Sequence, residues 1–444
     1  MTRCLAWHAP SASVWASEQA LVTTFLLKRG FLALLGTQFF GAANDNILKG
    51  VLTFMVIADG LWEGRLGSGG QGIIGLSFTL PFILLSGYGG QFADRNSKRT
   101  VSVLLKVLEI PIALTALAGF WIGNLWLTLA ALIALACQSA IFGPAKYGMI
   151  PELVAERDLS RANGVINMMT NIAVIVGMLA AGVIADAYHP PVVAGATSVA
   201  GALWLPGVVM WLVALVGVVC VLALTPLAPS DPGLRYTWNP FATYIDSLRQ
   251  MSHSALLMVA LAWGYFYLMA GLALLIIPEY AEVLHISRTD ASKLLGVMAI
   301  AVGFGSAAAG LISGKKIEPR LVPVGALGVT IFFVLLGVAT PTFANVAGFI
   351  FGAGFFAGFY IVPLQALIQQ LSPVGERGRF IGTADAISFS FLAVASALYW
   401  IIRPAFEGVG PQKIFLVSAG LMIAGAAYFL LRLRHVLSWR QLPA

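Results

Sequence analysis

Residues 72–120 read GIIGLSFTLPFILLSGYGGQFADRNSKRTVSVLLKVLEIPIALTALAGF, which is two long apolar runs joined by a short charged loop. A helix needs about 20 consecutive apolar residues to cross the hydrocarbon core of a bilayer. The runs 72–92 and 100–120 both reach that length. The loop between them is too short to form a domain of its own, so the stretch predicts a hairpin of two transmembrane helices.

The rest of the chain has the same character. Of its 444 residues 59% are hydrophobic and 10% are charged, and the mean hydropathy is +0.89. A soluble domain carries about 25% charged residues, so the composition excludes an ordinary soluble enzyme and a nucleic-acid-binding protein. Apolar runs predict an all-α integral membrane protein with twelve spans, at roughly 31–57, 72–92, 100–120, 125–146, 163–186, 193–224, 254–279, 292–314, 321–341, 343–371, 380–402 and 412–432.

The basic residues indicate the orientation of these spans. Nineteen of the 26 Lys and Arg residues fall in the connections on the side of the N-terminus, and five fall on the other side. Cytoplasmic loops carry the excess of Lys and Arg, so both termini are predicted to be cytoplasmic. The net charge of +7 therefore needs no nucleic-acid partner. The three cysteines are scattered and form no metal-binding pattern, and neither a metal nor a cofactor is predicted.

The two halves of the chain repeat each other. Gly90, Pro144 and Gly164 correspond to Gly310, Pro363 and Gly382, at offsets of 220, 219 and 218 residues. The repeat predicts two pseudo-symmetric six-helix bundles, an architecture in which transporters place the substrate between the halves. The predicted division is an N-terminal extension (1–30), a first bundle (31–224), a cytoplasmic linker (225–253), a second bundle (254–432) and a cytoplasmic tail (433–444).

Several motifs resemble those of a known family. The loop GQFADRNSKR at 90–99 resembles the signature of the major facilitator superfamily between its second and third helices, with Ser97 in place of the usual second glycine. The blocks GAANDN at 41–46, FGPAKYG at 142–148 and RANG at 161–164 resemble the bacterial lysophospholipid transporter branch of that superfamily.

This resemblance implies a function. A member of the branch moves lysophospholipids such as 2-acyl-glycerophosphoethanolamine inward across the bacterial inner membrane, by alternating access and with lateral entry from the bilayer lipids. Its functional partner is an acyltransferase, dependent on acyl-ACP or acyl-CoA, that re-acylates 2-acylglycerophosphoethanolamine. The seventh predicted helix, from Trp263 to Tyr267 onward, carries no basic residue where some relatives have an arginine.

The predicted first span contains an unusual polar run, Asn44, Asp45 and Asn46. A charge inside a span is costly and is a functional candidate by default. Asp45 is expected to bind an ammonium headgroup or to carry a coupling proton. The alternative is an intrahelical pair with Lys49, because an acid four residues before a base is a favourable arrangement.

The second candidate is Lys146, near the cytoplasmic end of the fourth span. A lysine there commonly extends to the interface, but its place in the Pro-Ala-Lys-Tyr-Gly block favours contact with a lipid phosphate. Gln138 lies two turns earlier on roughly the same face. Asn167, Gln365 and Asp385 are further candidates for a polar path, although polar side chains also join membrane helices by hydrogen bonds. Lys106 and Glu109, one turn apart, are expected to form a structural ion pair.

The charged loop is interpreted as a conformational latch. Its predicted members are Gly90, Asp94, Arg95, Lys98 and Arg99. The acid and the bases would brace helix ends across the cytoplasmic surface; the simpler interpretation is an anchor that only sets the topology.

Two alternative functions have partial support in the sequence. The spacing of His285 and Asp290 matches the HX4D pattern of glycerolipid acyltransferases, in which the histidine acts as a general base, but it lies in a short connection outside any acyl-binding domain and is interpreted as chance. No catalytic residue is predicted. The closer alternative is a proton-coupled exporter of amphipathic drugs on the same fold, with Asp45 as the titrating group.

Overall fold

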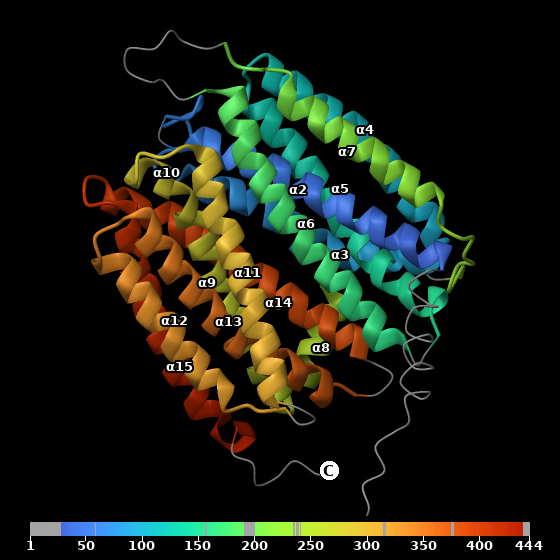
Figure 1. The fold of residues 1–444 in the computed structure, drawn as a ribbon. Helices are drawn as coiled ribbons and strands as arrows, with labels where there is room; N and C mark the ends of the chain where they lie inside the picture. Colours follow the sequence, from blue (N-terminus) through green and yellow to red (C-terminus); the bar gives the residue numbers. More distant parts are fainter. Residues whose placement is uncertain are drawn as a thin grey trace, which may run out of the picture.

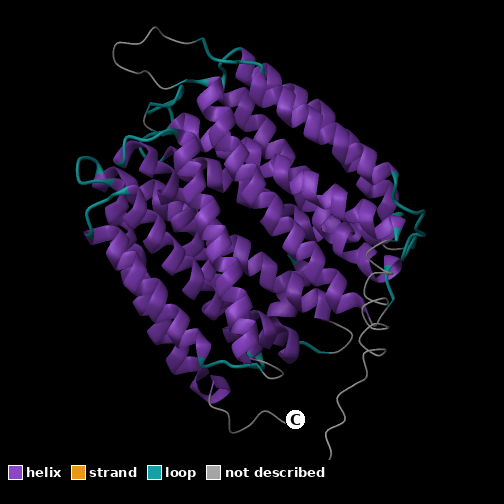
Figure 2. Cartoon of the chain, viewed as in Figure 1, coloured by secondary structure: helices purple, strands orange, loops and turns teal. Residues whose placement is uncertain are grey.

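The computed structural model describes residues 28–437, apart from 58, 156–157, 191–199, 234–235, 237–238, 240, 314–316 and 374–376. Within these residues all regular elements are helices and no strand occurs, as Figure 2 shows. The predicted all-α class is therefore confirmed for the described part of the chain.

Twelve long helices make up the described fold. In the first half they are α2 (Arg29–Val56), α3 (Gly70–Arg95), α4 (Lys98–Trp121), α5 (Leu125–Leu153), α6 (Leu159–Tyr188) and α7 (Leu205–Leu222). In the second half they are α9 (Leu256–Ile276), α11 (Arg288–Ser313), α12 (Leu321–Val338), α13 (Phe343–Leu371), α14 (Arg377–Ile402) and α15 (Ile414–Leu437). Short helices η2 (Ile277–Glu279) and α10 (Tyr280–Val283) extend α9, and η3 (Arg403–Phe406) and η4 (Pro411–Lys413) connect α14 to α15.

Eleven of these helices are long and apolar enough to cross a membrane. The exception is α2, whose apolar run is interrupted by Asn44, Asp45, Asn46 and Lys49. The helices that pack against α2, which are α3, α5, α6 and α7, all qualify as spans. Counting α2 with the eleven gives twelve, as the sequence predicts, and the chain is a multi-pass membrane protein.

The two halves pair their helices in the same way. Helix α2 packs on α6 and α7, and its counterpart α9 packs on α14 and α15; α4 contacts α5 and α7, as α12 contacts α13 and α15. The bundles lie side by side in Figure 1, the first in blue to green and the second in yellow to red. They meet along two helix pairs, α3 with α14 and α6 with α11. The pseudo-symmetric arrangement is confirmed.

Two boundaries differ from the prediction. The sixth helix starts at Leu205 rather than at residue 193, because the chain first turns back on α6, where the Ala202 amide donates to the Ala187 carbonyl (2.8 Å). The predicted linker contains an eleven-residue helix, α8 (Ala242–Ser252). The predicted extension and tail lie mostly outside the described residues, and α15 continues to Leu437.

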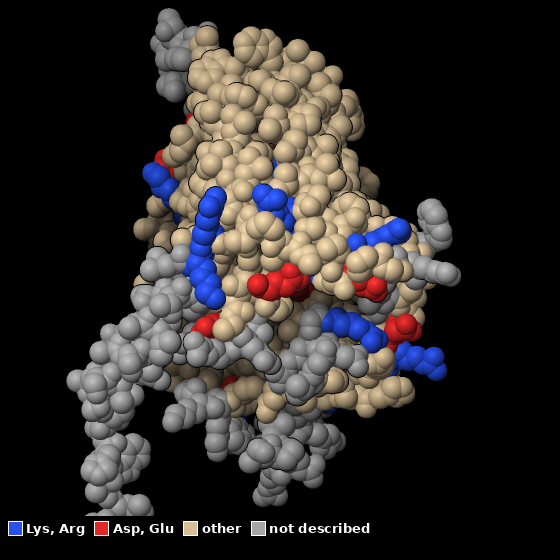
Figure 3. All heavy atoms as spheres, turned by 90° about the vertical axis from the view of Figure 1, so that its right-hand side faces the viewer, with Lys and Arg blue, Asp and Glu red and all other residues tan. Residues whose placement is uncertain are grey.

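The outer surface is suited to lipid. Large hydrophobic side chains of α4 and α7 are exposed, among them Leu104, Leu108, Leu212 and Val219. In Figure 3 most of the charged side chains on the face shown gather in its lower part, below a broad surface almost free of them. Such a surface needs an apolar solvent, which a bilayer provides.

Candidate functional site

The bundles are tied together at one end by Arg288, the first residue of α11. The residue is 4% exposed, and its guanidinium donates to the carbonyl of His189 (2.6 Å) and to that of Asp59. One carboxylate oxygen of Asp186, on α6, lies 3.8 Å from it. The other accepts hydrogen bonds from Thr289, from the amide at 2.8 Å and the hydroxyl at 2.6 Å. We call this the Arg288 end.

A second polar contact closes the same end. The Gln71 amide of α3 donates to the Leu275 carbonyl (3.0 Å), the Glu279 carboxylate (2.7 Å) and the Tyr399 hydroxyl (3.0 Å). Glu279 in turn forms a buried ion pair with Arg403 (2.8 Å). All three acceptors belong to the second half of the chain, so a single side chain of the first half completes the cluster.

Glycines let the helices approach closely there. A β-carbon on Gly182 of α6 would lie 2.6 Å from the Arg288 carbonyl, and one on Gly72 of α3 would lie 2.4 Å from the Ser396 carbonyl. Real β-carbons do not come so near to backbone atoms, so both interfaces between the halves require glycine. Close approach through small residues is typical of helices packed in a membrane.

The contacts change toward the opposite end, which we call the Lys98 end. Near the middle of α3 and α14, Phe82 and Phe389 stack with ring centroids 4.5 Å apart. Beyond that stack the two bundles are connected by hydrogen bonds to α8. Tyr244 of α8 forms a hydrogen bond with Ser86 of α3, and Ser247 of α8 accepts one from Arg379 of α14 (2.8 Å).

The predicted latch residues lie at the Lys98 end. Lys98 forms an ion pair with Glu152 (2.6 Å) and contacts Ser230, and Arg99 donates to the Leu224 carbonyl (2.9 Å). These partners all lie in the first half or in the segment after α7.

The remaining latch residues follow the same pattern. The Arg95 guanidinium lies over the Tyr236 ring (4.7 Å), and the Asp94 carbonyl accepts from the Asp231 amide (2.8 Å). Gly90 faces Pro144 at an ordinary contact distance. The segment after α7 is thus held against α3 and α4, and a bracing role between the bundles stays a prediction.

The polar run of α2 points in three directions. The Asn44 amide donates to Glu109 of α4 (2.9 Å), which also pairs with Lys106 (2.6 Å). The predicted Lys106–Glu109 pair is therefore confirmed, and it faces α2 rather than lipid. Asn46 donates to the Ala42 carbonyl of its own helix, so the hydrogen-bond partners of both asparagines lie in the first bundle.

Asp45 faces α5. The Ser139 hydroxyl lies within hydrogen-bonding distance of both its carboxylate oxygens (3.0 and 2.8 Å) and of the side-chain oxygen of Gln138 (3.1 Å). Lys49 instead places its ammonium over the Phe78 ring (5.0 Å). Among the described residues no ion pair joins Asp45 to Lys49, although the two charges attract each other.

Lys146 and its neighbours form a second cluster of polar side chains. Its ammonium lies 4.3 Å from the Tyr147 ring centroid, and the Tyr147 hydroxyl donates to Asn167 of α6 (3.3 Å). The Lys146 charge interacts electrostatically with Asp385 of α14 and with Asp45. Tyr147 thus connects Lys146 to Asn167, Asp385 acts on Lys146 through its charge alone, and Gln365 of α13 is partly buried.

The residues that join the two bundles at the Arg288 end were not predicted as site residues. Gln71, Asp186, Glu279, Arg288 and Arg403 lie at or near helix ends, where charges were interpreted only as topology signals. The available signal is that a buried charge at a helix end facing another bundle needs a partner. At the acyltransferase-like motif, the Asp290 carboxylate interacts with Ser287 and Lys293, and no described hydrogen bond joins it to His285.

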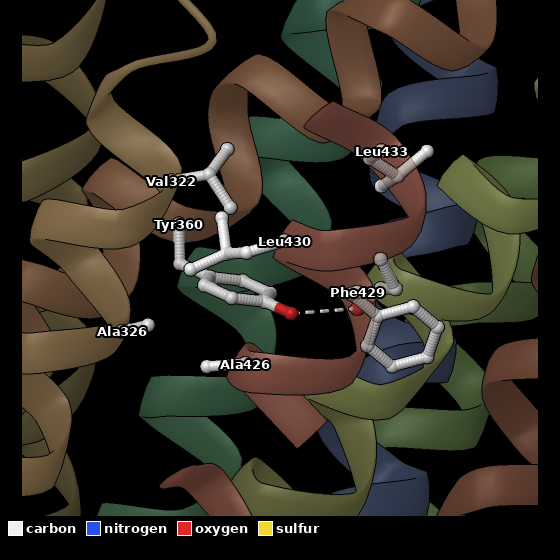
Figure 4. Close-up of a pocket in the computed structure, with 8 residues that line it drawn as sticks. Val322, Ala326, Tyr360, Ala426, Phe429, Leu430 and Leu433 are labelled. Atoms are coloured by element: carbon white, nitrogen blue, oxygen red, sulfur yellow. Dashed lines mark hydrogen bonds between the residues drawn. The ribbon is translucent and has the colours of Figure 1, made fainter. Parts of the chain in front are cut away.

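A small cavity lies within the second bundle, among α9, α12, α13 and α15 (Figure 4). It measures about 10 Å³ and is lined mainly by aliphatic and aromatic side chains, with the Tyr360 hydroxyl donating to the Ala262 carbonyl (3.1 Å). It is too small for any ligand beyond a single water. Among the described residues no three His, Cys, Asp or Glu side chains are grouped as metal ligands.

Comparison with known proteins agrees with this fold. The family model of the Major Facilitator Superfamily matches residues 30–398. The chain is 29% identical over 401 residues to the lysophospholipid transporter LplT of Yersinia enterocolitica, covering 86% of this chain and 88% of that protein. It is 27% identical over 426 residues to LplT of Cronobacter sakazakii, covering 94% and 97%.

Solved structures are similar in fold alone. A bacterial homologue of the human lysosomal transporter Spinster, in an inward-facing and unoccupied conformation, is 14% identical with a TM-score of 0.67, over 94% of this chain and 99% of that one. A POT family transporter in complex with 5-aminolevulinic acid is 12% identical with a TM-score of 0.69, over 93% and 97%.

Proposed function

Because this chain belongs to the Major Facilitator Superfamily, we propose that it carries lysophospholipids across the bacterial inner membrane toward the cytoplasmic leaflet. The observation that carries the proposal is its similarity to lysophospholipid transporters over nearly their whole length. The fold supports it, since two related bundles that meet along two helix pairs are suited to alternating access.

The orientation follows from the charge of the loops. Nineteen basic residues on the side of the N-terminus, against five on the other, favour cytoplasmic termini and a cytoplasmic Lys98 end. The Arg288 end is then periplasmic, and the conformation is one in which the periplasmic end is closed. Ser97→Cys in a cysteine-free background tests the orientation. An impermeant maleimide should label it only after the cells are opened, and labelling of intact cells would reverse the assignment.

The polar residues at and near the bundle interface are the proposed path of the headgroup. Lys146 contacts the phosphate, because an ammonium is a compact donor to a phosphodiester. Asp45, Gln138, Asn167 and Gln365 offer further polar contacts. Asn44 and Asn46 flank Asp45 in α2 and add to the polarity of this part of the path. The lysolipid enters laterally between the bundles, either alongside α3 and α14 or alongside α6 and α11, while its acyl chain remains in the bilayer.

The product of transport has a defined chemical fate. A lysophospholipid delivered to the cytoplasmic leaflet has a free hydroxyl, which a separate acyltransferase dependent on acyl-ACP or acyl-CoA re-acylates. We assign no catalytic residue to this chain itself. The division into an extension (1–30), two bundles (31–224 and 254–432), a linker (225–253) and a tail (433–444) is kept as the working domain organisation.

Transport in proteoliposomes tests the function. Purified protein should move labelled lysophosphatidylethanolamine between leaflets and leave a cationic amphipathic dye in place. A matched control is Lys146→Ala, which should insert normally and move the lipid at a strongly reduced rate, with Lys146→Arg recovering part of it. Movement of the dye with no movement of the lipid would favour a drug exporter instead.

A further inference from the structure

Side chains one turn apart on α4 face residues one turn apart on α2, inside the first bundle. The Asn44 amide of α2 donates to the Glu109 carboxylate of α4 (2.9 Å), and Glu109 pairs with Lys106, one turn earlier on α4 (2.6 Å). A β-carbon on Gly41, one turn before Asn44, would lie 2.4 Å from the Lys106 ammonium nitrogen. Gly41 therefore leaves the space that this ammonium occupies, and the two helices match at both positions.

This polar group is deeply buried. Asn44, Lys106 and Glu109 are 0%, 2% and 1% exposed. A buried ion pair is weak evidence for stability, because the cost of removing both charges from water offsets their attraction. The best-attested use of buried polar groups is to specify one arrangement of helices among several. Specification of an arrangement is therefore the role that suits this group.

Helix α2 has no apolar stripe that would set its rotation about its own axis. Every residue from Ala43 to Val56 except Lys49 is buried, so buried positions lie on all its faces. The hydrophobic effect is non-directional, and between helices in lipid it provides no driving force. A directional contact such as the Asn44–Glu109 hydrogen bond can select one rotation.

The rotation of α2 decides where Asp45 points. Successive residues of an α-helix are about 100° apart around the axis. With Asn44 held toward α4, Asp45 is turned toward α5, where the Ser139 hydroxyl lies 3.0 and 2.8 Å from its carboxylate oxygens. Helix α4 is not among the helices of the described fold that pack closely on α2, so its long side chains make the connection.

We propose that Lys106 and Glu109 are positioning residues that fix the rotation of α2, with Asn44 as their point of attachment. We call these three residues the α2 lock. They act through Asp45, which they hold toward α5. The inference rests on the proposed function in that Asp45 lies on the proposed path of the headgroup, whereas the lock itself is a property of the first bundle.

An apolar replacement of the α2 lock separates positioning from stability. Asn44→Leu, Lys106→Met and Glu109→Leu together remove the three polar groups and keep their approximate size. Apolar residues of similar volume often replace a buried ion pair without loss of stability, so the Tm of the purified protein should not fall. Lysolipid transport should fall at least about 10-fold, since a displacement of about 1 Å can cost up to about 100-fold where geometry is critical. A merely structural pair would instead lower the Tm and reduce transport in proportion.

Cross-linking reports the rotation of α2 without transport. Asp45→Cys with Ser139→Cys in a cysteine-free background should cross-link on oxidation, and the apolar replacement should lower the yield several-fold. Since the cysteines replace the Asp45–Ser139 contact itself, the yield reports the lock. The matched control is Ser102→Cys with Met149→Cys, which joins α4 to α5 (4.0 Å) without α2 and should cross-link equally in both proteins.

A charge-swapped pair keeps the polar connection. Lys106→Glu with Glu109→Lys places an ammonium opposite Asn44, whose side-chain oxygen is buried and has no hydrogen-bond partner among the described residues. That oxygen can accept from the ammonium, so the swapped variant should recover much of the cross-linking and transport. Lys293→Met removes an exposed ion pair of the same spacing, Asp290–Lys293 (2.6 Å), and should change neither.

The outcomes are distinguishable. Unchanged cross-linking in a stable apolar variant overturns the lock, whether or not transport falls. If the apolar variant does not fold, the charge-swapped protein decides: recovered cross-linking supports the lock, and its loss in a stable protein overturns it. If the wild type moves no lysolipid, the proposed function fails, and cross-linking between positions 45 and 139 still decides the lock.

Discussion

The Gln71 amide of α3 crosses between the bundles and donates a hydrogen bond of 2.7 Å to the Glu279 carboxylate. The Glu279–Arg403 pair lies wholly within the second half and survives when the halves separate. The three hydrogen bonds of Gln71 do not. They are therefore part of the difference in free energy between the closed and open states of the Arg288 end.

Replacing this amide should open the Arg288 end. Gln71→Leu keeps the approximate size and removes the donor, so the closed state should lose about 1 to 3 kcal/mol, the cost of hydrogen bonds to a charged acceptor. A reporter cysteine at Ser396, which is buried in the closed interface, should then react faster with an impermeant maleimide. An unchanged reaction rate would mean that Gln71 does not hold this end closed.

A methyl group on Gly182 should have a related but distinct effect. Gly182→Ala places a β-carbon 2.6 Å from the Arg288 carbonyl, so α6 and α11 must move apart and transport should fall at least several-fold. The matched control is Gly303→Ala in α11, where a β-carbon would meet no atom within 4 Å. Lysolipid flux through both variants should be compared at equal protein content; equal flux would contradict the requirement for close approach.

Acid should weaken the same end through His189. Burial and the neighbouring Arg288 guanidinium hold the pKa of His189 below its usual range, with Asp59 acting in the opposite sense. Because the pKa of His189 is depressed, protonation of its ring is unfavourable in the closed state. The stability of the closed state is therefore full above about pH 6.5, the ordinary value, and is lost as the pH falls below it.

Accessibility of the Ser396 reporter should accordingly rise as the pH falls below about 6.5. His189→Asn removes the titrating ring and keeps the carbonyl that accepts from Arg288, so its accessibility should not change over that interval. A variant that retains the full pH response would assign it to another group.

Asp45 should contribute equally to the transport of lysolipids with different headgroups. Its carboxylate is held by Ser139, so Asp45→Asn should slow lysolipids with and without an ammonium group to the same extent. Since Lys49 lies over the Phe78 ring and not in an ion pair with Asp45, adding Lys49→Gln should not restore transport. Flux of both lipids through the single and double variants checks this. Rescue by the second substitution would support the intrahelical pair instead.

The sequence predicts the helices well and the contacts between bundles poorly. The number of spans follows from the length of the apolar runs, because a segment in lipid must form its backbone hydrogen bonds within its own helix. The pairing of the helices follows from the repeat. The identity of the partners depends on where helices cross, which composition does not encode. Thus the Lys106–Glu109 pair, one turn apart, was predictable, whereas Asn44 as a third member of that group was not.

The ties at the Arg288 end show the same limit. Gln71 and Glu279 are 208 residues apart in sequence, and no local pattern connects them. By contrast, the likeness of Asn167 and Asp385 as repeat equivalents was visible in the sequence. The hydrogen bond from Tyr147 to Asn167 was not visible there.

The polar run of α2 also constrains how the protein is made. Eleven of the described helices are long and apolar enough to cross a membrane, and α2 falls short of them. An aspartate alone costs about 2.5 to 3.5 kcal/mol at the centre of an inserting helix. The groups that receive its polar side chains, Glu109 and Ser139, are synthesised about 65 and 94 residues after their partners. We therefore expect α2 to insert stably only together with α4 and α5, which supply the partners of its polar side chains.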